Sequence, residues 1–205
     1  MSSADSWETI RQYVDRQRTY LRNPLPPSPW ICGTCRGTCA EGFTLCRRCS
    51  DHHDGGGQML ADAVIPISYS PRTGQHHHHL RMYKAFPPSA QAQRNLLALL
   101  LQFLRDHLDC VAVVAGGHPT HIATVPSTRG RPGPHPLSTL IGRRLGLPWV
   151  PATTNPRYGP DDRDFHRDWF TAHLPGQPAP TRVLIPDDTP AGRGFLRPAG
   201  PQTAP

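Results

Sequence analysis

Two long stretches of the chain lack proline and glycine, and both carry apolar side chains at helical spacing. In the first, from Met1 to Asn23, four apolar residues lie on one face of a 3.6-residue period: Trp7, Ile10, Val14 and Leu21. In the second, from Ser89 to Ala115, the apolar stripe is much wider: Leu96, Leu97, Leu99, Leu100, Leu101, Phe103, Leu104 and Leu108. We therefore expect an amphipathic helix near the N-terminus and a long helix buried over most of its circumference. A third, shorter helix is predicted over 137–145, between Pro136 and Gly146.

Candidate strands are short apolar runs bounded by turn residues. They cover residues 63–69, 121–125, 149–152 and 182–185. After residue 88, helices and strands therefore alternate, which is typical of an α/β domain with a mostly parallel sheet. Ligands of such sheets bind at the carboxyl ends of the strands, so the residues that directly follow each strand are the candidates for chemistry.

Five of the six cysteines fall within residues 32–49. Two Cys-x2-Cys pairs, Cys32 with Cys35 and Cys46 with Cys49, can supply four thiolates to one tetrahedral zinc ion. A structural zinc knuckle is the expected role, and Cys39 either replaces one ligand or is a bystander thiol. Nucleic-acid binding is the alternative for this segment, because three arginines beside the cysteines could contact phosphates: Arg36, Arg47 and Arg48.

The remaining cysteine and the histidines show no spacing that is specific for a metal site. Cys110 ends the apolar helix and is expected to be a small buried side chain. The run His76–His79 could bind a metal ion, but four adjacent side chains cannot all face one ion in regular backbone, so a solvated loop between two elements is the favoured interpretation. His52 and His53 could assist the zinc, but a position in the polar linker before Gly55 is the favoured interpretation.

Composition narrows the function classes. A length of 205 residues allows one ordinary domain and a small appendage, and 25 prolines with 18 glycines do not reach the level of a disordered chain. The absence of a long apolar run excludes a membrane-spanning helix, and the polar N-terminus argues against a secretory signal. A cytoplasmic protein with reduced cysteines is expected. The net charge of +7, from 21 arginines and Lys84 against 15 acidic residues, permits an anionic partner without demonstrating one.

Two segments that follow predicted strands carry candidate ligand-binding groups. Asp187 and Asp188 come after the apolar run Val-Leu-Ile-Pro, where carboxylates can accept hydrogen bonds from vicinal sugar hydroxyls or hold Mg²⁺. Residues 126–133 read Pro-Ser-Thr-Arg-Gly-Arg-Pro-Gly, and their hydroxyl, backbone N–H and guanidinium groups are suited to an oxyanion. Each segment also has an ordinary interpretation as a turn.

The order of these motifs resembles that of the ComF-like phosphoribosyltransferases of actinobacteria. The resemblance covers about 30–189 and includes Tyr69-x5-Gln75-His76-x3-Leu80-x2-Tyr83-Lys84 between the cysteines and the long helix. It implies a type I phosphoribosyltransferase fold in an α/β domain over 60–189, behind an N-terminal helix and linker (1–29) and a zinc knuckle (30–54). It also implies that phosphoribosyl pyrophosphate binds with Mg²⁺.

The resemblance assigns roles by position. Ser127, Thr128 and Arg129 match the pyrophosphate loop, and residues 155–169 match the mobile loop that covers the substrate. Asp187 and Asp188 match the acidic pair that holds the ribose hydroxyls, and Thr189 opens the loop that grips the 5′-phosphate.

The sequence departs from this family directly after Thr189. The family continues with two more threonines and a helix, whereas Pro190 and a Pro/Ala/Gly-rich tail (190–205) follow here. We expect a disordered tail, a sheet without its last elements, and a frameshift or truncation near Thr189 that the nucleotide sequence would reveal. The resulting hypothesis is a ligand-binding protein with impaired transferase activity. The alternative is a non-catalytic zinc-bearing module that binds single-stranded DNA in DNA uptake.

Overall fold

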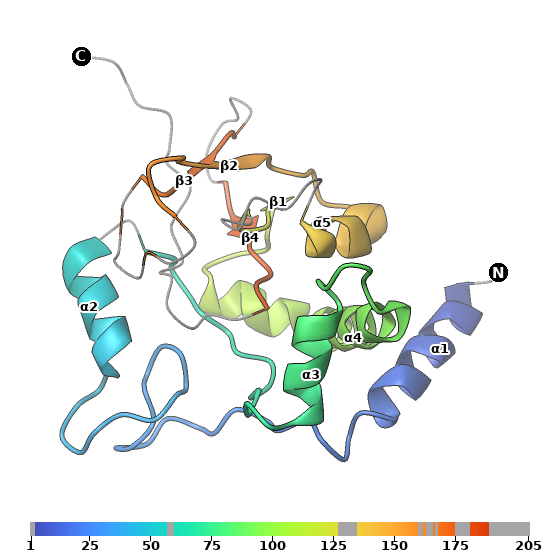
Figure 1. Cartoon of the computed structure of the whole chain (residues 1–205), viewed down its shortest axis with the longest axis horizontal. Helices are drawn as coiled ribbons and strands as arrows, with labels where there is room; N and C mark the ends of the chain where they lie inside the picture. The colour runs from blue at the N-terminus through green and yellow to red at the C-terminus, as the bar shows by residue number, and fades with distance from the viewer. Residues whose placement is uncertain are drawn as a thin grey trace.

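A computed structural model describes residues 3–56, 60–126, 135–159, 162, 166, 168–174 and 181–188. Its helices are α1 (Ser3–Asp15), α2 (Arg47–Gly56), α3 (Gln75–Met82), α4 (Ala90–Val114) and α5 (Pro136–Ile141). A 3₁₀ turn, Gly142–Leu145, continues α5. Its strands are β1 (His121–Ile122), β2 (Ala152–Thr154), β3 (Phe170–Ala172) and β4 (Val183–Leu184). Figure 1 shows α4 near the centre, with α1 at the right and the strands above it.

Both stretches without proline or glycine contain helices, as the sequence predicts, but α1 ends at Asp15, so Leu21 of the predicted apolar face lies beyond it. The 25-residue helix α4 begins after Ser89, whose hydroxyl accepts a hydrogen bond from the backbone N–H of Ala92. Helix α1 lies against α4, and the segment after it is fixed by Gln17, which is fully buried and donates to the backbone carbonyl of Asn95 at 3.1 Å. The guanidinium of Arg105 lies 4.8 Å from the ring of Trp7 and links the two helices at their surface. The predicted third helix is also confirmed, as α5 and its 3₁₀ turn.

The described strands form a small parallel sheet and a separate antiparallel pair. β1 pairs with β4 in parallel, with His121 opposite Val183, and Ile122 also makes a parallel bridge to Trp149 on its other side. β2 pairs with β3 antiparallel. The protein is therefore a mixed α/β structure in which the carboxyl ends of β1 and β4 lie at the same edge.

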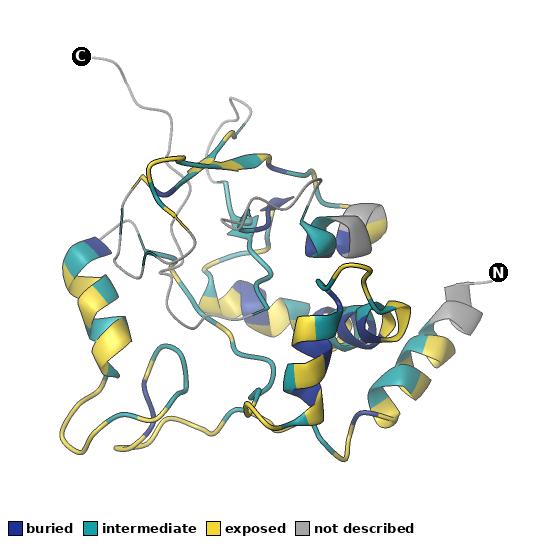
Figure 2. Ribbon diagram, in the orientation of Figure 1, coloured by how far each residue is buried: buried dark blue, intermediate teal, exposed yellow. Residues whose placement is uncertain are grey.

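The hydrophobic core joins the parallel strands to three helices (Figure 2). Ile122 of β1 is fully buried and packs with residues from α3, the loop that follows it, α4 and α5: Leu80, Tyr83, Ala92, Leu96, Leu137 and Ile141. Because Tyr83 is in this cluster, the loop between α3 and α4 is anchored in the core rather than lying free on the surface.

One predicted strand is absent and one observed strand was not predicted. Residues 63–69 form no strand, and only Tyr69 makes a bridge, to Arg22. Pro66 lacks a backbone donor, which disfavours a continuous ladder there. The hydroxyl of Tyr69 instead accepts from the backbone N–H of Leu25 at 3.0 Å and donates to the carbonyl of Arg36 at 2.6 Å. The additional strand, β3, is a short segment, Phe-Thr-Ala, that pairs with β2.

The histidine run does not form a solvated loop, and that interpretation was wrong. His76–His79 lie in helix α3, where His76 and His79 are three residues apart on one face and are both buried. His79 lies within hydrogen-bond distance of Tyr20, Gln75 and Asn95. Helical spacing thus divides the run into a buried pair and two side chains that are more accessible.

Two smaller expectations were also wrong. His52 and His53 lie within helix α2, not in a linker. Cys110 is exposed on α4 rather than buried, because it lies on the side of the helix that faces solvent. Among the described residues, no helix combines the length and apolar character needed to cross a membrane.

Acidification is expected to destabilise the fold through His76. Burial, helped by the neighbouring His79 and His77, lowers the pKa of His76 from 6.5 to about 4. Below pH 6.5 the unfolded chain binds a proton that the folded protein excludes until about pH 4, so this stability is lost as the pH falls across that interval. Between pH 7.5 and pH 5 the free energy of unfolding should drop by about 2 kcal/mol on this account.

Urea unfolding at the two pH values measures this effect. His76→Leu removes the titrating group and should flatten the pH dependence, whereas His78→Gln, at an exposed position of the same helix, should retain it. A His76→Leu variant as acid-sensitive as the unsubstituted protein would assign the effect to other groups.

Candidate metal centre and acidic site

The four cysteines of the two Cys-x2-Cys pairs lie together. The Sγ atoms of Cys32, Cys35, Cys46 and Cys49 all lie within 4.8 Å of one another. The Sγ atoms of Cys35 and Cys46 are 3.7 Å apart. Zn–S bonds of about 2.3 Å in a tetrahedron separate the sulfurs by about 3.8 Å, so this arrangement can hold one metal ion such as zinc.

Backbone hydrogen bonds build the two turns that bring these thiols together. In the first turn, the N–H of Cys32 donates to the backbone carbonyl of Gly37 at 2.8 Å. The carbonyl of Cys32 accepts from the backbone N–H of Arg36 at 3.1 Å. Arg36 has a φ of 60°, and this left-handed conformation closes the turn. Gly33 donates to the carbonyl of Thr44 at 2.9 Å, which holds the first turn against the segment leading into α2. Cys46 precedes α2 and Cys49 lies in its first turn.

Neighbouring groups shift the thiol pKa values in opposite directions. Burial acts to raise the pKa of Cys32, but backbone N–H groups of Cys46, Cys35 and Thr34 and the Cys35 thiol stabilise its thiolate and lower the pKa to about 6. Burial raises the pKa of Cys35, and burial together with the adjacent thiols raises that of Cys49. The surroundings of Cys32 therefore favour its thiolate, whereas those of Cys35 and Cys49 favour the neutral thiol.

Cys39 lies outside this group of four. Its Sγ is directed to backbone carbonyl oxygens, at 3.3 Å from that of Phe43 and 3.8 Å from that of Pro29. Its N–H donates to the carbonyl of Trp30 at 2.9 Å. Cys39 thus joins segments of the loop that carry the exposed rings of Trp30 and Phe43.

The acidic pair follows β4 at the carboxyl edge of the parallel sheet. Ala123, directly after β1, donates to the carbonyl of Leu184 at 2.9 Å, so the two strands run side by side to their ends. The chain leaves β1 toward Pro126 and leaves β4 toward Asp187 from this same edge. The other predicted ligand-binding residues lie outside the described residues: Ser127, Thr128, Arg129 and Thr189.

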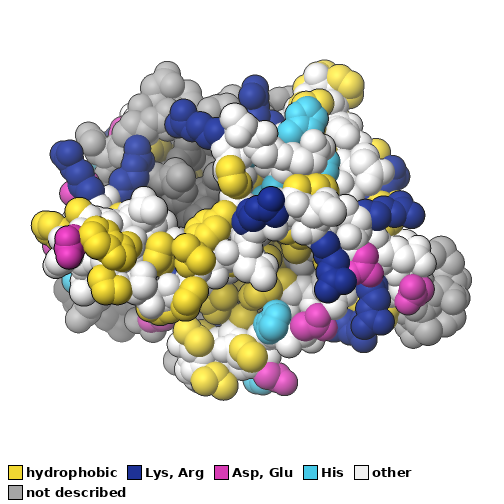
Figure 3. Space-filling view, turned by 90° about the horizontal axis from the view of Figure 1, so that it is seen from below, with side chains coloured by type: hydrophobic (Ala, Val, Ile, Leu, Met, Phe, Trp, Pro, Cys, Tyr) yellow, Lys and Arg dark blue, Asp and Glu magenta, His cyan; other side chains and the backbone are white. Residues whose placement is uncertain are grey.

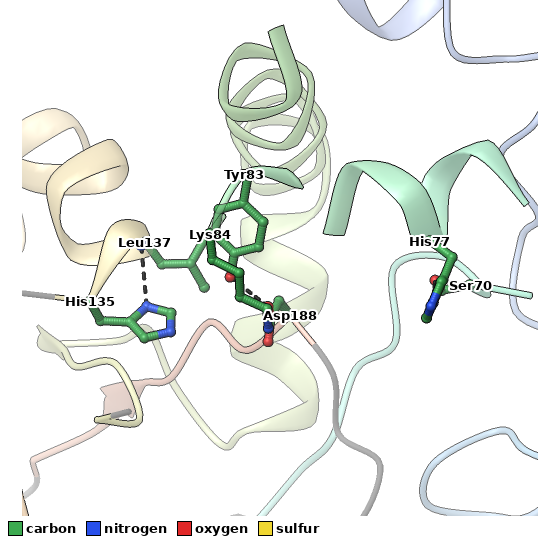
Figure 4. A network of polar contacts seen from close by, with 7 residues as sticks. All are labelled: Ser70, His77, Tyr83, Lys84, His135, Leu137 and Asp188. Carbon is green, nitrogen blue, oxygen red and sulfur yellow. Dashed lines mark hydrogen bonds and ion pairs between the residues drawn. The ribbon is translucent and has the colours of Figure 1, made fainter. Parts of the chain in front are cut away.

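Asp188 contacts two side chains that were not assigned a role from the sequence. Its Oδ2 accepts a hydrogen bond from the hydroxyl of Tyr83 at 2.5 Å and forms an ion pair with the ammonium of Lys84. Figure 4 shows the three side chains pointing toward one another, with Asp188 approaching from the end of β4. The Asp188 side chain is 8% exposed and that of Lys84 is 29% exposed. The sequence did contain one signal that could have drawn attention to Lys84, since it is the one lysine in a chain with 21 arginines.

The described residues of the predicted covering loop, 155–169, form a packed aromatic group between β2 and β3. The rings of Tyr158 and His166 are stacked with centroids 3.9 Å apart, and Trp169 packs against both. Asp168 accepts hydrogen bonds from Tyr158 at 2.7 Å and Asn155 at 2.8 Å, and the Tyr158 bond in particular lowers the pKa of Asp168.

Comparison with protein families, with curated proteins and with solved structures finds no match to this chain. The described residues nonetheless contain two groups suited to binding: the four-cysteine cluster and the acidic site around Asp188. Function is therefore inferred from the chemistry of these two groups.

Proposed function

We propose that this chain is a phosphoribosyltransferase-like protein of the ComF type that binds a phosphoribosyl ligand at the carboxyl ends of β1 and β4. The observation that supports the proposal is the parallel pairing of these strands, because Pro126 and Asp187 therefore both follow strand ends at one edge of the sheet. A zinc ion bound by the four cysteines would stabilise the N-terminal segment. A reducing compartment such as the cytoplasm suits these thiols.

The residues at this edge have complementary chemistry toward such a ligand. The carboxylates of Asp187 and Asp188 would accept hydrogen bonds from vicinal ribose hydroxyls, while Ser127, Thr128 and Arg129 would bind the pyrophosphate. Mg²⁺, when bound with the ligand, would neutralise charge on the leaving pyrophosphate. Catalysis would be weak, because Thr189 is followed by Pro190 instead of the donors that grip a 5′-phosphate.

Titration with labelled phosphoribosyl pyrophosphate and Mg²⁺ tests this proposal. Asp187→Asn should weaken binding by about 10-fold or more, since it removes an anionic acceptor for a sugar hydroxyl. Asp106→Asn, which makes the same change at an exposed position on α4, is the matched control and should bind like the unsubstituted protein. Equal affinity of the Asp187→Asn and unsubstituted proteins would refute the phosphoribosyl site.

A zinc-bearing module that binds single-stranded DNA is the second candidate, and one observation favours it. The cysteine loop carries two exposed aromatic rings, Trp30 at 54% and Phe43 at 66%, and the adjoining Arg47 and Arg48 are also exposed. Figure 3, a view from below, shows hydrophobic side chains gathered on part of the visible face, with both Lys and Arg and Asp and Glu side chains at the edges of this area. Exposed rings that stack on bases, beside cations that contact phosphates, are typical of surfaces that bind single strands.

Binding of a single-stranded oligonucleotide distinguishes this second candidate from the phosphoribosyl site. Trp30→Ala and Phe43→Ala should each weaken binding of a single-stranded oligonucleotide by about 5-fold or more, because each removes a stacking surface. Asp187→Asn should leave this binding unchanged. Binding that is insensitive to both aromatic substitutions would exclude the loop as the DNA-binding surface.

A further inference from the structure

The acidic site contains a cation that comes from a distant part of the chain. Lys84 lies in the loop between α3 and α4, and its ammonium contacts the Oδ2 of Asp188, 104 residues away (Figure 4). Its side chain is more exposed than that of Asp188, at 29% against 8%. The Lys84 side chain is therefore more accessible to a ligand from solvent than the carboxylate that it contacts.

The backbone around Lys84 is held firmly. The adjacent Tyr83 is fully buried, its N–H donates to the carbonyl of His79 at 3.0 Å, and its carbonyl accepts from the side chain of Gln93 at 3.5 Å. Its hydroxyl donates to the same oxygen of Asp188 at 2.5 Å. Asp188 therefore keeps one strong donor, from Tyr83, when the ammonium of Lys84 turns to another partner.

The chemistry of lysine suits an exchange of partners. An ammonium is a point charge with three donors on a flexible four-carbon stem, whereas a guanidinium is a rigid planar fork. This chain uses arginine for its other 21 basic side chains and has lysine at this position. A poorly exposed carboxylate needs a counter-charge when no ligand is bound, and Lys84 supplies it.

We propose that Lys84 is an anion-binding residue whose ammonium group is held by Asp188 until the pyrophosphate group of a ligand replaces that carboxylate. The proposal rests on the proposed function, because it places a pyrophosphate group at the edge where the phosphoribosyl ligand would bind. In this arrangement the internal carboxylate competes with the anion for the same ammonium.

Calorimetric titration of the full chain with inorganic pyrophosphate, without Mg²⁺, tests the proposal. Lys84→Gln should weaken pyrophosphate binding by about 10-fold, the usual effect of losing a hydrogen bond between charged groups, and Lys84→Arg should retain part of the affinity. Asp188→Asn should strengthen it by about 3-fold or more, because the competing carboxylate is gone. Arg81→Gln, which removes one exposed positive charge from α3, controls for net charge and should change little.

Several results would overturn the proposal. They are equal affinity of Lys84→Gln and the unsubstituted protein, weaker binding by Asp188→Asn, or no pyrophosphate binding at all. A purely structural ion pair predicts lower thermal stability of Lys84→Gln with unchanged pyrophosphate affinity, so unfolding is measured in parallel. If Lys84→Gln does not fold, Lys84→Arg and Asp188→Asn decide the question.

The two proposals fail in different ways. Without a phosphoribosyl site, Asp187→Asn has no effect on phosphoribosyl pyrophosphate binding, while pyrophosphate affinity still depends on Lys84. If instead Asp187→Asn weakens binding of the phosphoribosyl ligand and Lys84→Gln leaves pyrophosphate affinity unchanged, only the role of Lys84 is refuted.

Discussion

Replacing Cys32 with serine is expected to reduce the bound zinc from about one ion per chain to almost none. Cys32 is fully buried among the other three sulfurs, so a serine oxygen there cannot replace a thiolate ligand without leaving a distorted, weaker site. Because the segment has little apolar core of its own, its folding free energy should come mainly from the metal. Zinc content after exhaustive dialysis and the release of zinc to a chromogenic chelator measure the effect.

Cys110→Ser is the matched control for this experiment. It makes the same chemical change at an exposed position of α4, outside the four-cysteine cluster, and should leave the zinc content unchanged. Cys39→Ser tests whether the fifth cysteine of the loop contributes to zinc binding. Because Cys39 lies outside the four-cysteine cluster, this variant should keep its full zinc content. Full zinc content in Cys32→Ser would show that these sulfurs are not the metal site.

The largest effect on stability is expected from Tyr83→Ala, at about 3–5 kcal/mol of unfolding free energy. The ring of Tyr83 is fully buried in the core shared by the helices and β1, so its removal leaves a cavity. The same substitution also removes the hydrogen bond that the Tyr83 hydroxyl donates to the nearly buried carboxylate of Asp188. Chemical denaturation followed by circular dichroism measures the loss.

Tyr83→Phe separates these two contributions. It retains the ring and its packing but removes the donor to Asp188, and should cost about 1–3 kcal/mol. A cost as large as that of Tyr83→Ala would mean that the hydroxyl, and not packing of the ring, accounts for the effect. A negligible cost in both variants would contradict the position of Tyr83 in the core.

The features that the sequence predicted correctly depend on local patterns. α1 and α4 follow from stretches without proline or glycine together with apolar periodicity, and the clustering of the four cysteines follows from two tight turns. The strands after α4 were found at their approximate positions because short apolar runs between turn residues mark buried strands. The parallel pairing of β1 with β4 also agrees with the predicted α/β class, whereas β2 and β3 pair antiparallel.

The features that were missed depend on contacts between distant segments. Residues 63–69 have the composition of a strand but gain no continuous partner, and β3 exists only because β2 pairs with it. His76 and His79 could be separated from their neighbours only once the run was known to be helical. The contact of Lys84 with Asp188 joins residues 104 positions apart, and no local pattern predicts it.

The hydroxyl of Tyr69 connects the cysteine loop to the rest of the protein. It bridges Leu25, on the chain entering that loop, and Arg36, inside the first cysteine turn, while Tyr69 itself leads into α3. Ordering of the loop by a metal ion and anchoring of the segment before α3 therefore become linked equilibria, in which each favours the other. Since α3 leads directly to Tyr83 and Lys84, metal occupancy would set how firmly the acidic site is assembled.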